Sequence, residues 1–259
     1  TQAEMTAPEC IVNSTNEPDV LLWGDSNAGH YVGAFKVLGE FMGFGFRNIV
    51  HSACPPLINN AEQYTSEKWK ERCAESSKLV ADNLESYDSV ILAASWDTAI
   101  KYGPDLSAEL TNSVSALVNS GKNVYVVGRT PRLDGNYQTC RIKQLKGVEC
   151  ELDGLIRIKQ AEEINEIVRQ VAEQHGATYL DFNGAFCLSE SCGPYIENEF
   201  VYFDGGHISL TGSEILGMAA AQSEQVQKAL SKLAVEPGVA TDNDIIWKVD
   251  HVIDYMPTS

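Results

Sequence analysis

The chain has 259 residues, of which 44% are hydrophobic and 21% charged, and these proportions are ordinary for a folded globular protein. Its 19 basic and 36 acidic residues give a net charge of −17, and a surface this acidic repels phosphate backbones, so we expect no nucleic-acid partner. No apolar run approaches the roughly 18–20 residues that a membrane-spanning helix needs.

Apolar runs alternate with helical patterns along the chain. Residues 1–18 are polar, contain Pro8 and Pro18, and are expected to form a linker. Continuous apolar runs are typical of parallel strands that helices cover on both faces. These runs are Val20–Trp23, Phe46–Val50, Ser89–Ala94, Asn123–Val127 and Thr178–Phe182. The expected helices are residues 28–42, residues 155–175 with Gly176 as the stop, and residues 211–233 with Ser209 or Thr211 as the N-cap. The alternation predicts an α/β fold, a three-layer α/β/α sandwich with a mainly parallel sheet of about five strands.

Two stretches do not follow this alternation. Residues 129–154 form a long irregular segment, and segments of this kind are usually functional or disordered. Its first part is rich in basic residues, so we expect a cationic rim, with Arg132 and Arg141 as substrate-binding residues that attract an anionic substrate. The alternative is a loop whose basic side chains are simply solvated. Residues 234–259 are expected to pack as an extension on a catalytic domain of residues 19–233.

The seven cysteines suggest a compartment. Three successive local pairs lie in loop-like sequence and leave Cys10 over; the pairs are Cys54–Cys73, Cys140–Cys150 and Cys187–Cys192. Each would stabilise the fold by roughly 2–3 kcal/mol through the entropy of the unfolded chain. Reduced thiols in a cytosolic protein are the alternative, and a zinc site is disfavoured because no C-x-x-C pair occurs. We favour an extracytoplasmic location, either periplasmic or secreted.

Two short motifs could carry chemistry. Gly24–Asp25–Ser26 follows the first strand, at the sheet edge where ligands of α/β proteins bind. Asp204 and His207 are three residues apart in a turn before the last helix. A serine needs a base such as histidine to become a nucleophile, and the histidine needs a carboxylate to orient it. The alternatives are that Ser26 merely caps a helix and that His207 is structural.

Together the motifs resemble the SGNH/GDSL hydrolase superfamily. The closer resemblance is to the extracytoplasmic SGNH domain fused to the acyltransferase-3 family of membrane O-acyltransferases. It rests on a set of segments spanning roughly residues 18–233. These are Gly24–His30, Cys54–Pro56, Val90–Trp96, Thr130–Pro131, and Cys187–Cys192 leading into Tyr202–Ser209.

The resemblance implies Ser26 as the nucleophile, His207 as the base, Asp204 as its orienting acid, and the Ser26 backbone N–H in an oxyanion hole. The superfamily adds a glycine N–H and an asparagine after a middle strand, but here Trp96 stands in the place of that asparagine. Asn27 and Ser95 are therefore candidate oxyanion donors, and Ser52 or Ala53 could supply the second backbone N–H. Trp96 is either a substrate contact or a core residue.

Other polar residues near the motifs have simpler interpretations. Asp25 is expected to bind local backbone N–H groups and hold the turn. His30 lies one helical turn after Ser26 and either lines the same cleft, as a substrate-binding residue, or is structural.

The leading function is serine-dependent O-acyl transfer, with acetyl as the expected group, to or from carbohydrate hydroxyls of a bacterial surface or secreted glycan. We expect a glycan acceptor, an acyl donor and a membrane acyltransferase domain or partner, and no cofactor or metal. A free-standing secreted carbohydrate acetylesterase is the alternative within the same chemistry. Metal-dependent hydrolysis by Asp25, His30, Asp204 and His207, and a catalytically weak glycan-binding module, are alternatives of other classes.

Overall fold

The computed structural model describes residues 3–133, 142–143, 145–149, 157–188, 191–196 and 199–234. At its centre is a six-stranded sheet in the order β1-β3-β2-β4-β5-β6. The strands are β1 (Ile11–Val12), β2 (Val20–Gly24), β3 (Phe46–Val50), β4 (Ser89–Ala93), β5 (Asn123–Val127) and β6 (Thr178–Leu180). All neighbours pair in parallel except β1, which is antiparallel to β3. The five predicted strands are confirmed, and β1 is an additional edge strand.

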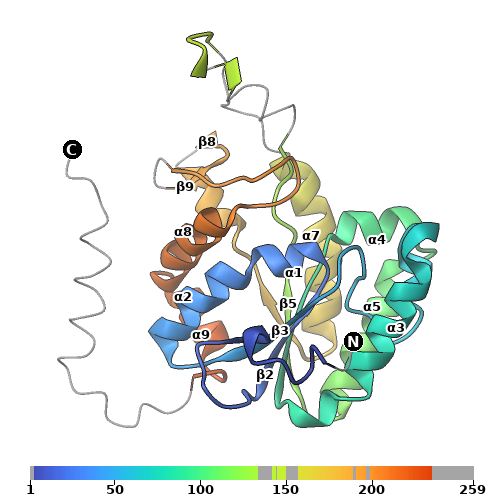
Figure 1. The fold of residues 1–259 in the computed structure, drawn as a ribbon. Coiled ribbons are helices and arrows are strands. Elements are labelled where there is room, and N and C mark those ends of the chain that lie inside the picture. The colour runs from blue at the N-terminus through green and yellow to red at the C-terminus, as the bar shows by residue number, and fades with distance from the viewer. Residues whose placement is uncertain are drawn as a thin grey trace, which may run out of the picture.

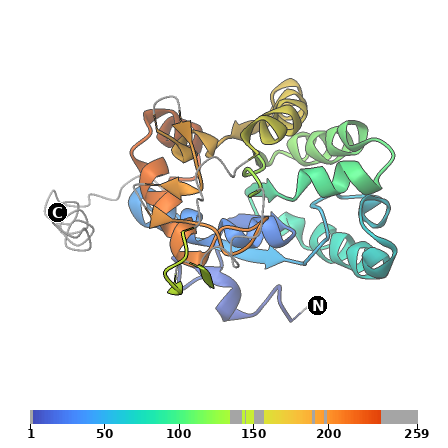
Figure 2. The same cartoon turned by 90° about the horizontal axis from the view of Figure 1, so that it is seen from above.

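The sheet lies between two layers of helices because both of its faces are apolar. Along β2, Leu22 faces one hydrophobic core and its neighbours Leu21 and Trp23 face the other. The first core contains side chains of α1 (Ser26–His30), α2 (Val32–Met42), α8 (Leu210–Ala221) and α9 (Glu224–Leu230). The second contains side chains of α3 (Lys70–Ala81), α4 (Trp96–Tyr102), α5 (Leu106–Asn119) and α7 (Ile158–Gln174). Figures 1 and 2 show α2 and α8 on one side of the sheet and α3, α4 and α5 on the other. The predicted three-layer α/β/α architecture is confirmed.

Two of the predicted helices are each interrupted once. The helix expected over residues 28–42 begins earlier, at Ser26, and breaks at Tyr31 between α1 and α2. The helix expected over 211–233 divides into α8 and α9, because Ser223 caps a new helix by accepting a hydrogen bond from a backbone N–H. The predicted stop at Gly176 agrees with its left-handed backbone, with φ of 81°.

Short elements complete the described chain. The 3-10 helices are η1 (Pro8–Cys10), η2 (Ala61–Tyr64), η3 (Glu67–Trp69), η4 (Leu84–Ser86) and η5 (Asn183–Phe186). Two small hairpins precede α8, formed by β7 (Cys187–Leu188) with β8 (Ser191–Cys192) and by β9 (Tyr195–Ile196) with β10 (Glu199–Phe200). In the described residues no helix is both long and apolar enough to cross a membrane.

The N-terminal segment departs from the expected linker. From residue 3 onward it packs against the sheet, with Met5 buried and residues 11–12 forming β1. The physical reason is Arg47 of β3, whose side chain is 1% exposed and therefore needs partners for its charge and its N–H groups. Its Nε and Nη2 donate to the carboxylate of Glu17, and its Nη1 donates to two backbone carbonyls of the segment.

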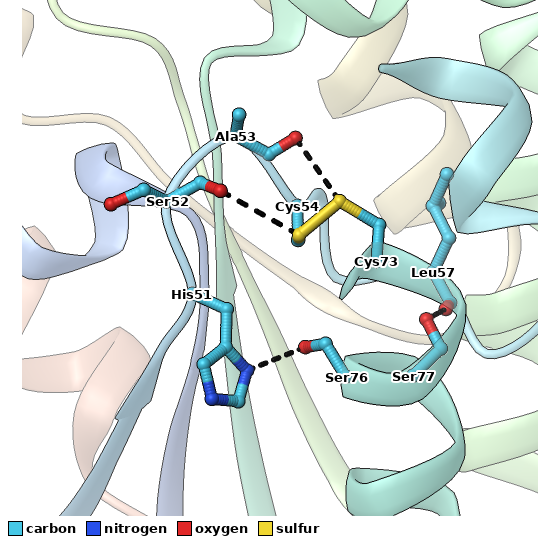
Figure 3. The surroundings of a disulfide bond; sticks show 8 residues. All are labelled: His51, Ser52, Ala53, Cys54, Leu57, Cys73, Ser76 and Ser77. Carbon is cyan, nitrogen blue, oxygen red and sulfur yellow. Dashed lines mark hydrogen bonds between the residues drawn. A yellow bond between two sulfur atoms is a disulfide. The ribbon is translucent and has the colours of Figure 1, made fainter. Parts of the chain in front are cut away.

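One of the three predicted disulfides, Cys54–Cys73, is confirmed with both of its partners. Cys54, in the loop after β3, is bonded to Cys73 of α3, and both residues are buried (Figure 3). Cys187 is also disulfide-bonded, and the β7–β8 register places it opposite Cys192. The bond between these two cysteines stays a prediction. Cys10 is free. Cys140 and Cys150 lie outside the described residues, as do Arg141 and the expected C-terminal extension.

Candidate active site

The Gly24–Asp25–Ser26 motif lies at the carboxyl end of β2, in the middle of the sheet. Gly24 is required there because a Cβ atom at this position would lie 1.8 Å from the carbonyl oxygen of Ala93 in the neighbouring strand β4. Asp25 is the N-cap of α1, and its side chain accepts the Asn27 backbone N–H. Ser26 is therefore the first helical residue rather than the cap, and its half-buried hydroxyl is free to serve chemistry.

Ser26, His207 and Asp204 form one hydrogen-bonded chain. The Ser26 Oγ lies 2.8 Å from Nε2 of His207. On the opposite side of the imidazole ring, Nδ1 lies 2.9 Å from each carboxylate oxygen of Asp204. The two motifs are 181 residues apart in sequence, so only the fold brings them together. This order of hydroxyl, imidazole and carboxylate is the arrangement that activates a serine nucleophile.

The catalytic turn, residues 202–207, holds its own acid and base in place. Asp204 Oδ1 accepts the backbone N–H groups of Gly206 (2.7 Å) and His207 (2.9 Å) in addition to the imidazole N–H. Partial burial would raise the pKa of Asp204, but the hydrogen bonds from Gly206 and His207 outweigh it and lower the pKa. Asp204 is therefore a charged carboxylate at neutral pH and can stabilise a positively charged imidazole ring.

The segment that follows β5 braces this turn. The Leu133 backbone N–H donates to the carbonyl of Gly205 (3.0 Å), and the Tyr202 hydroxyl donates to the carbonyl of Pro131 (2.6 Å). Tyr202 is buried. The start of the long irregular segment thus has a structural role at the site.

Asp25 links the start of α1 to the loop after β4. One carboxylate oxygen accepts the Asn27 N–H (2.8 Å) and the other accepts the Ser95 N–H (2.9 Å). Burial raises the pKa of Asp25 to about 6, although these two backbone N–H groups act in the opposite direction. Both of its oxygens hold backbone, as expected from the sequence, and neither bonds His207.

Two of the residues predicted near the oxyanion hole are used elsewhere. Trp96 is fully buried and its Nε1–H donates to the carbonyl of Val127 at 2.8 Å, so the expected substrate contact is wrong and the core alternative is correct. The Ser95 backbone N–H is bonded to Asp25, and its hydroxyl donates to Asp97 at 2.7 Å. Asn27 has its backbone N–H on Asp25, while its buried side-chain oxygen has no hydrogen-bond partner.

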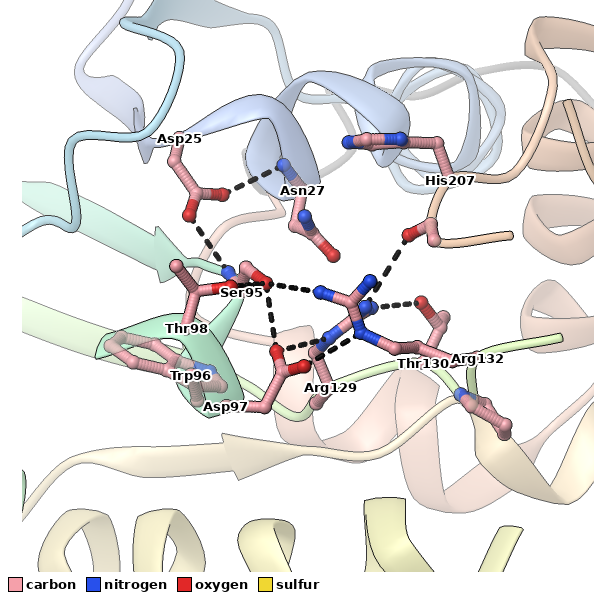
Figure 4. Close-up of polar contacts among 12 residues, drawn as sticks. Asp25, Asn27, Ser95, Trp96, Asp97, Thr98, Arg129, Thr130, Arg132 and His207 are labelled. Atoms are coloured by element: carbon pink, nitrogen blue, oxygen red, sulfur yellow. Dashed lines mark hydrogen bonds and ion pairs between the residues drawn. The ribbon is translucent and has the colours of Figure 1, made fainter. Parts of the chain in front are cut away.

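A charged cluster beside the turn was not anticipated from the sequence. Asp97 accepts Arg129 Nε at 3.0 Å on one oxygen and Arg132 Nε at 2.6 Å on the other. Arg129 is 2% exposed and its Nη2 reaches the carbonyl of Gly206 at 3.4 Å; Arg132 is 38% exposed and its Nη2 donates to Ser95 Oγ at 3.3 Å. Figure 4 shows both guanidinium groups among the polar residues of the site.

The backbone of Arg129 is also fixed by buried amides. The Asn165 side chain accepts its N–H and donates to its carbonyl, and Asn183 donates to the same carbonyl. The sequence shows Arg129 and Arg132 only as part of a basic segment. The aspartate that pairs with both of them lies in a different loop, so sequence spacing carried no signal for the cluster.

His30 lies deep beside the triad. Its ring centre is 6.2 Å from that of His207, and its Nε2 is 3.5 Å from the Thr130 hydroxyl. Burial, and then the positive charge of Arg129, lower the pKa of His30 well below its ordinary value, so the ring is neutral. Because it is 7% exposed, it packs under the site rather than lining an open cleft. Within the described chain, no three His, Cys, Asp or Glu side chains are placed to hold a metal ion.

Comparison with known proteins agrees with this geometry. A family model described as the SGNH domain fused to AT3 domains matches residues 1–222. The chain belongs to this SGNH family. The resemblance inferred from the motifs is therefore confirmed, and the SGNH domain supports an esterase or another acyl-group enzyme. Among curated proteins, no sequence matches the chain.

One solved structure shows the same fold at low sequence identity, and a second is similar at a lower TM-score. The periplasmic domain of the lipopolysaccharide acetyltransferase of Salmonella ser. Paratyphi A is 14% identical, with a TM-score of 0.61 over 83% of this chain and 85% of that one. The aryl esterase of M. smegmatis is 18% identical, with a TM-score of 0.44 over 82% of this chain and 99% of that one.

Proposed function

We propose that this SGNH domain is a serine enzyme that transfers an O-acyl group, with acetyl as the expected group, to or from carbohydrate hydroxyls through an acyl-enzyme on Ser26. The observation that carries the proposal is the hydrogen-bonded chain from Ser26 through His207 to Asp204. Ser26, His207 and Asp204 are only partly buried, so none of the three side chains is needed to fill the hydrophobic core.

The chemistry follows from the order of the three groups. His207 Nε2 accepts the Ser26 proton as Oγ bonds to the acyl carbon, and the carbonyl electron pair moves onto its oxygen. The tetrahedral intermediate collapses, the leaving alkoxide takes the proton from His207, and an acyl-enzyme remains. Water or a sugar hydroxyl then attacks the acyl carbon while His207 accepts its proton, and Ser26 Oγ leaves as it takes that proton back from His207. Asp204 stabilises the imidazolium in both steps.

Backbone N–H groups at two loops suit the oxyanion of this intermediate. The Ser26 N–H lies at the start of α1. The loop after β3 continues beside β2, since the His51 N–H donates to the Gly24 carbonyl at 3.0 Å. In this loop Ala53 has a left-handed backbone with φ of 64°, a conformation that costs an alanine roughly 1–2 kcal/mol and is unusual outside glycine. We assign Ala53 as the second backbone donor, ahead of Ser52.

Transfer is favoured over simple hydrolysis by the family to which the chain belongs. The family description joins this domain to AT3 domains, and the Salmonella domain with the same fold is the periplasmic part of an acetyltransferase. These comparisons support our proposal that the domain acts outside the cytoplasm, beside a membrane acyltransferase domain or partner, with a surface or secreted glycan as acceptor. The disulfide between Cys54 and Cys73 fits an oxidising compartment.

The direct test is to trap the acyl-enzyme. Incubation with an acetyl ester should add one acetyl group to the peptide that contains Ser26, and a fluorophosphonate should label the same residue. Ser26→Ala should abolish both, and His207→Ala should lower kcat by about 10⁴-fold or more, because the residues of a triad act as a unit. Ser231→Ala, which removes an exposed serine hydroxyl from the end of α9, is the matched control. Full activity in Ser26→Ala would refute the proposal. Acetylation of an added oligosaccharide, rather than release of acetate, would establish transfer over hydrolysis.

A further inference from the structure

We propose that Arg132 is a catalytic residue of this site, and that its guanidinium donates a hydrogen bond to the oxyanion of the tetrahedral intermediate formed on Ser26. The inference deepens the proposed function and rests on it.

Most donors near Ser26 are already engaged by the protein. The backbone N–H groups of Asn27 and Ser95 both bind the carboxylate of Asp25. The indole N–H of Trp96, in the same loop as Ser95, is bonded in the core. A backbone N–H that holds the loop geometry cannot also turn toward an oxyanion, so the loop after β4 offers no unengaged donor among these groups.

The buried arginine is engaged as well. Arg129 donates through Nε to Asp97, through Nη1 to the Thr130 hydroxyl and through Nη2 to the Gly206 carbonyl. With its side chain 2% exposed, it is out of reach of a substrate. Arg129 therefore supports the catalytic turn and does not act on the reacting atoms.

Arg132 differs from Arg129 in having donors to spare. Its Nε is bonded to Asp97 and its Nη2 to Ser95, but among the residues that the structure describes none accepts a hydrogen bond from Nη1, and the side chain is 38% exposed. Nη1 lies 3.0 Å from the position that a Cβ atom on Gly206 would take. Gly206 is the residue before His207, so this nitrogen lies beside the catalytic turn. The glycine leaves the room that the guanidinium occupies.

The same contacts fix the orientation of the Arg132 guanidinium. Asp97 and Ser95 hold one edge of the planar guanidinium against the loop after β4, and the opposite edge faces the catalytic turn. Ser26 and Arg132 both follow the carboxyl ends of parallel strands, so an ester attacked by Ser26 lies at the end of the sheet where this guanidinium is held. A fixed cation there stabilises the negative charge that develops on the carbonyl oxygen of that ester and costs little reorganisation. Asp97 neutralises only one of the two arginines, so the cluster keeps a net positive charge.

The test compares Arg132→Gln with the parent on p-nitrophenyl acetate, which is a small neutral ester. We expect kcat to fall about 10²–10³-fold with little change in KM, as for the loss of one oxyanion donor. Phenylboronic acid forms an anionic tetrahedral adduct with an active-site serine, and its affinity should fall by a similar factor. Arg132→Lys should restore part of kcat, because it keeps the charge but not the planar fork.

Arg169→Gln is the matched control, because Arg169 is a surface arginine on α7 with a similar exposure of 40% and carboxylate partners of its own. It should leave kcat unchanged. Folding of Arg132→Gln is checked by its thermal midpoint, which should stay near the parent value since Asp97 keeps Arg129 as a partner.

Three results would overturn the inference while Ser26→Ala still abolishes activity. One is an unchanged kcat and boronate affinity in Arg132→Gln. Another is a KM increase confined to an anionic ester, which would make Arg132 an electrostatic recruiter of substrate. The third is loss of kcat in Asn27→Ala but not in Arg132→Gln, which would assign the donor to the Asn27 amide. Activity that survives Ser26→Ala would instead refute the proposed function itself.

Discussion

The Cys54–Cys73 disulfide gives a stability prediction with a definite size. Replacing both cysteines by alanine frees a loop whose ends are 19 residues apart, and the chain-entropy cost of closing such a loop is worth about 3 kcal/mol at 25 °C. We therefore expect the free energy of unfolding to fall by about that amount. The bond also anchors the loop that contains Ala53, because Cys73 of α3 lies against the Ala53 carbonyl (Figure 3). The kcat of the double variant on p-nitrophenyl acetate should fall as well.

Urea unfolding at neutral pH measures the first effect, with Cys10→Ala as the control. Cys10 is free and only partly buried, so its replacement should change stability by less than about 0.5 kcal/mol. A loss below about 1 kcal/mol in the double variant would contradict the entropy estimate and show that the unfolded chain is already constrained in this region. An unchanged kcat would show that the loop keeps the Ala53 geometry without the bond.

Three further predictions concern the N-terminal segment, the core and the cysteines. Glu17→Gln should cost about 1.5–3 kcal/mol, the range for a hydrogen bond to a charged group, because Arg47 is buried against it. Hydrogen bonding to Arg47 lowers the pKa of Glu17 below 4.5, so this contribution is complete above pH 4.5 and is lost as the pH falls through the lowered value; urea titrations of parent and variant should converge in acid. Trp96→Phe should cost about 1–3 kcal/mol by leaving the Val127 carbonyl without its partner, with kcat unchanged, and a fall in kcat would return Trp96 to the active site. Non-reducing peptide mapping should find the pairs Cys54–Cys73, Cys140–Cys150 and Cys187–Cys192 with Cys10 alkylated, and any bridge to Cys10 would refute the scheme.

The sequence by itself determined the architecture and pointed to the residues of the proposed triad. Strands such as Val20–Gly24 and Ser89–Ala93 are apolar on both faces, and only a sheet covered by two layers of helices can bury such runs. Gly24 and Ser26 could be predicted from the sequence because a strand that turns abruptly into a helix needs particular residue types at fixed spacing. The turn from Asp204 to His207 is equally local, since three of its hydrogen bonds lie within four residues.

Only the tertiary structure decided how residues far apart in sequence share their hydrogen bonds. The N-terminal segment became part of the sheet because Arg47, more than 25 residues later, is buried and needs Glu17. Trp96 became a core residue because the carbonyl of Val127 in the next strand accepts its N–H. Arg132 lies beside the turn that contains Asp204 and His207 because Asp97 holds it there from another loop. Each outcome depends on satisfying a buried or partly buried polar group with a partner from a different element, and composition and spacing along one chain do not record such pairings.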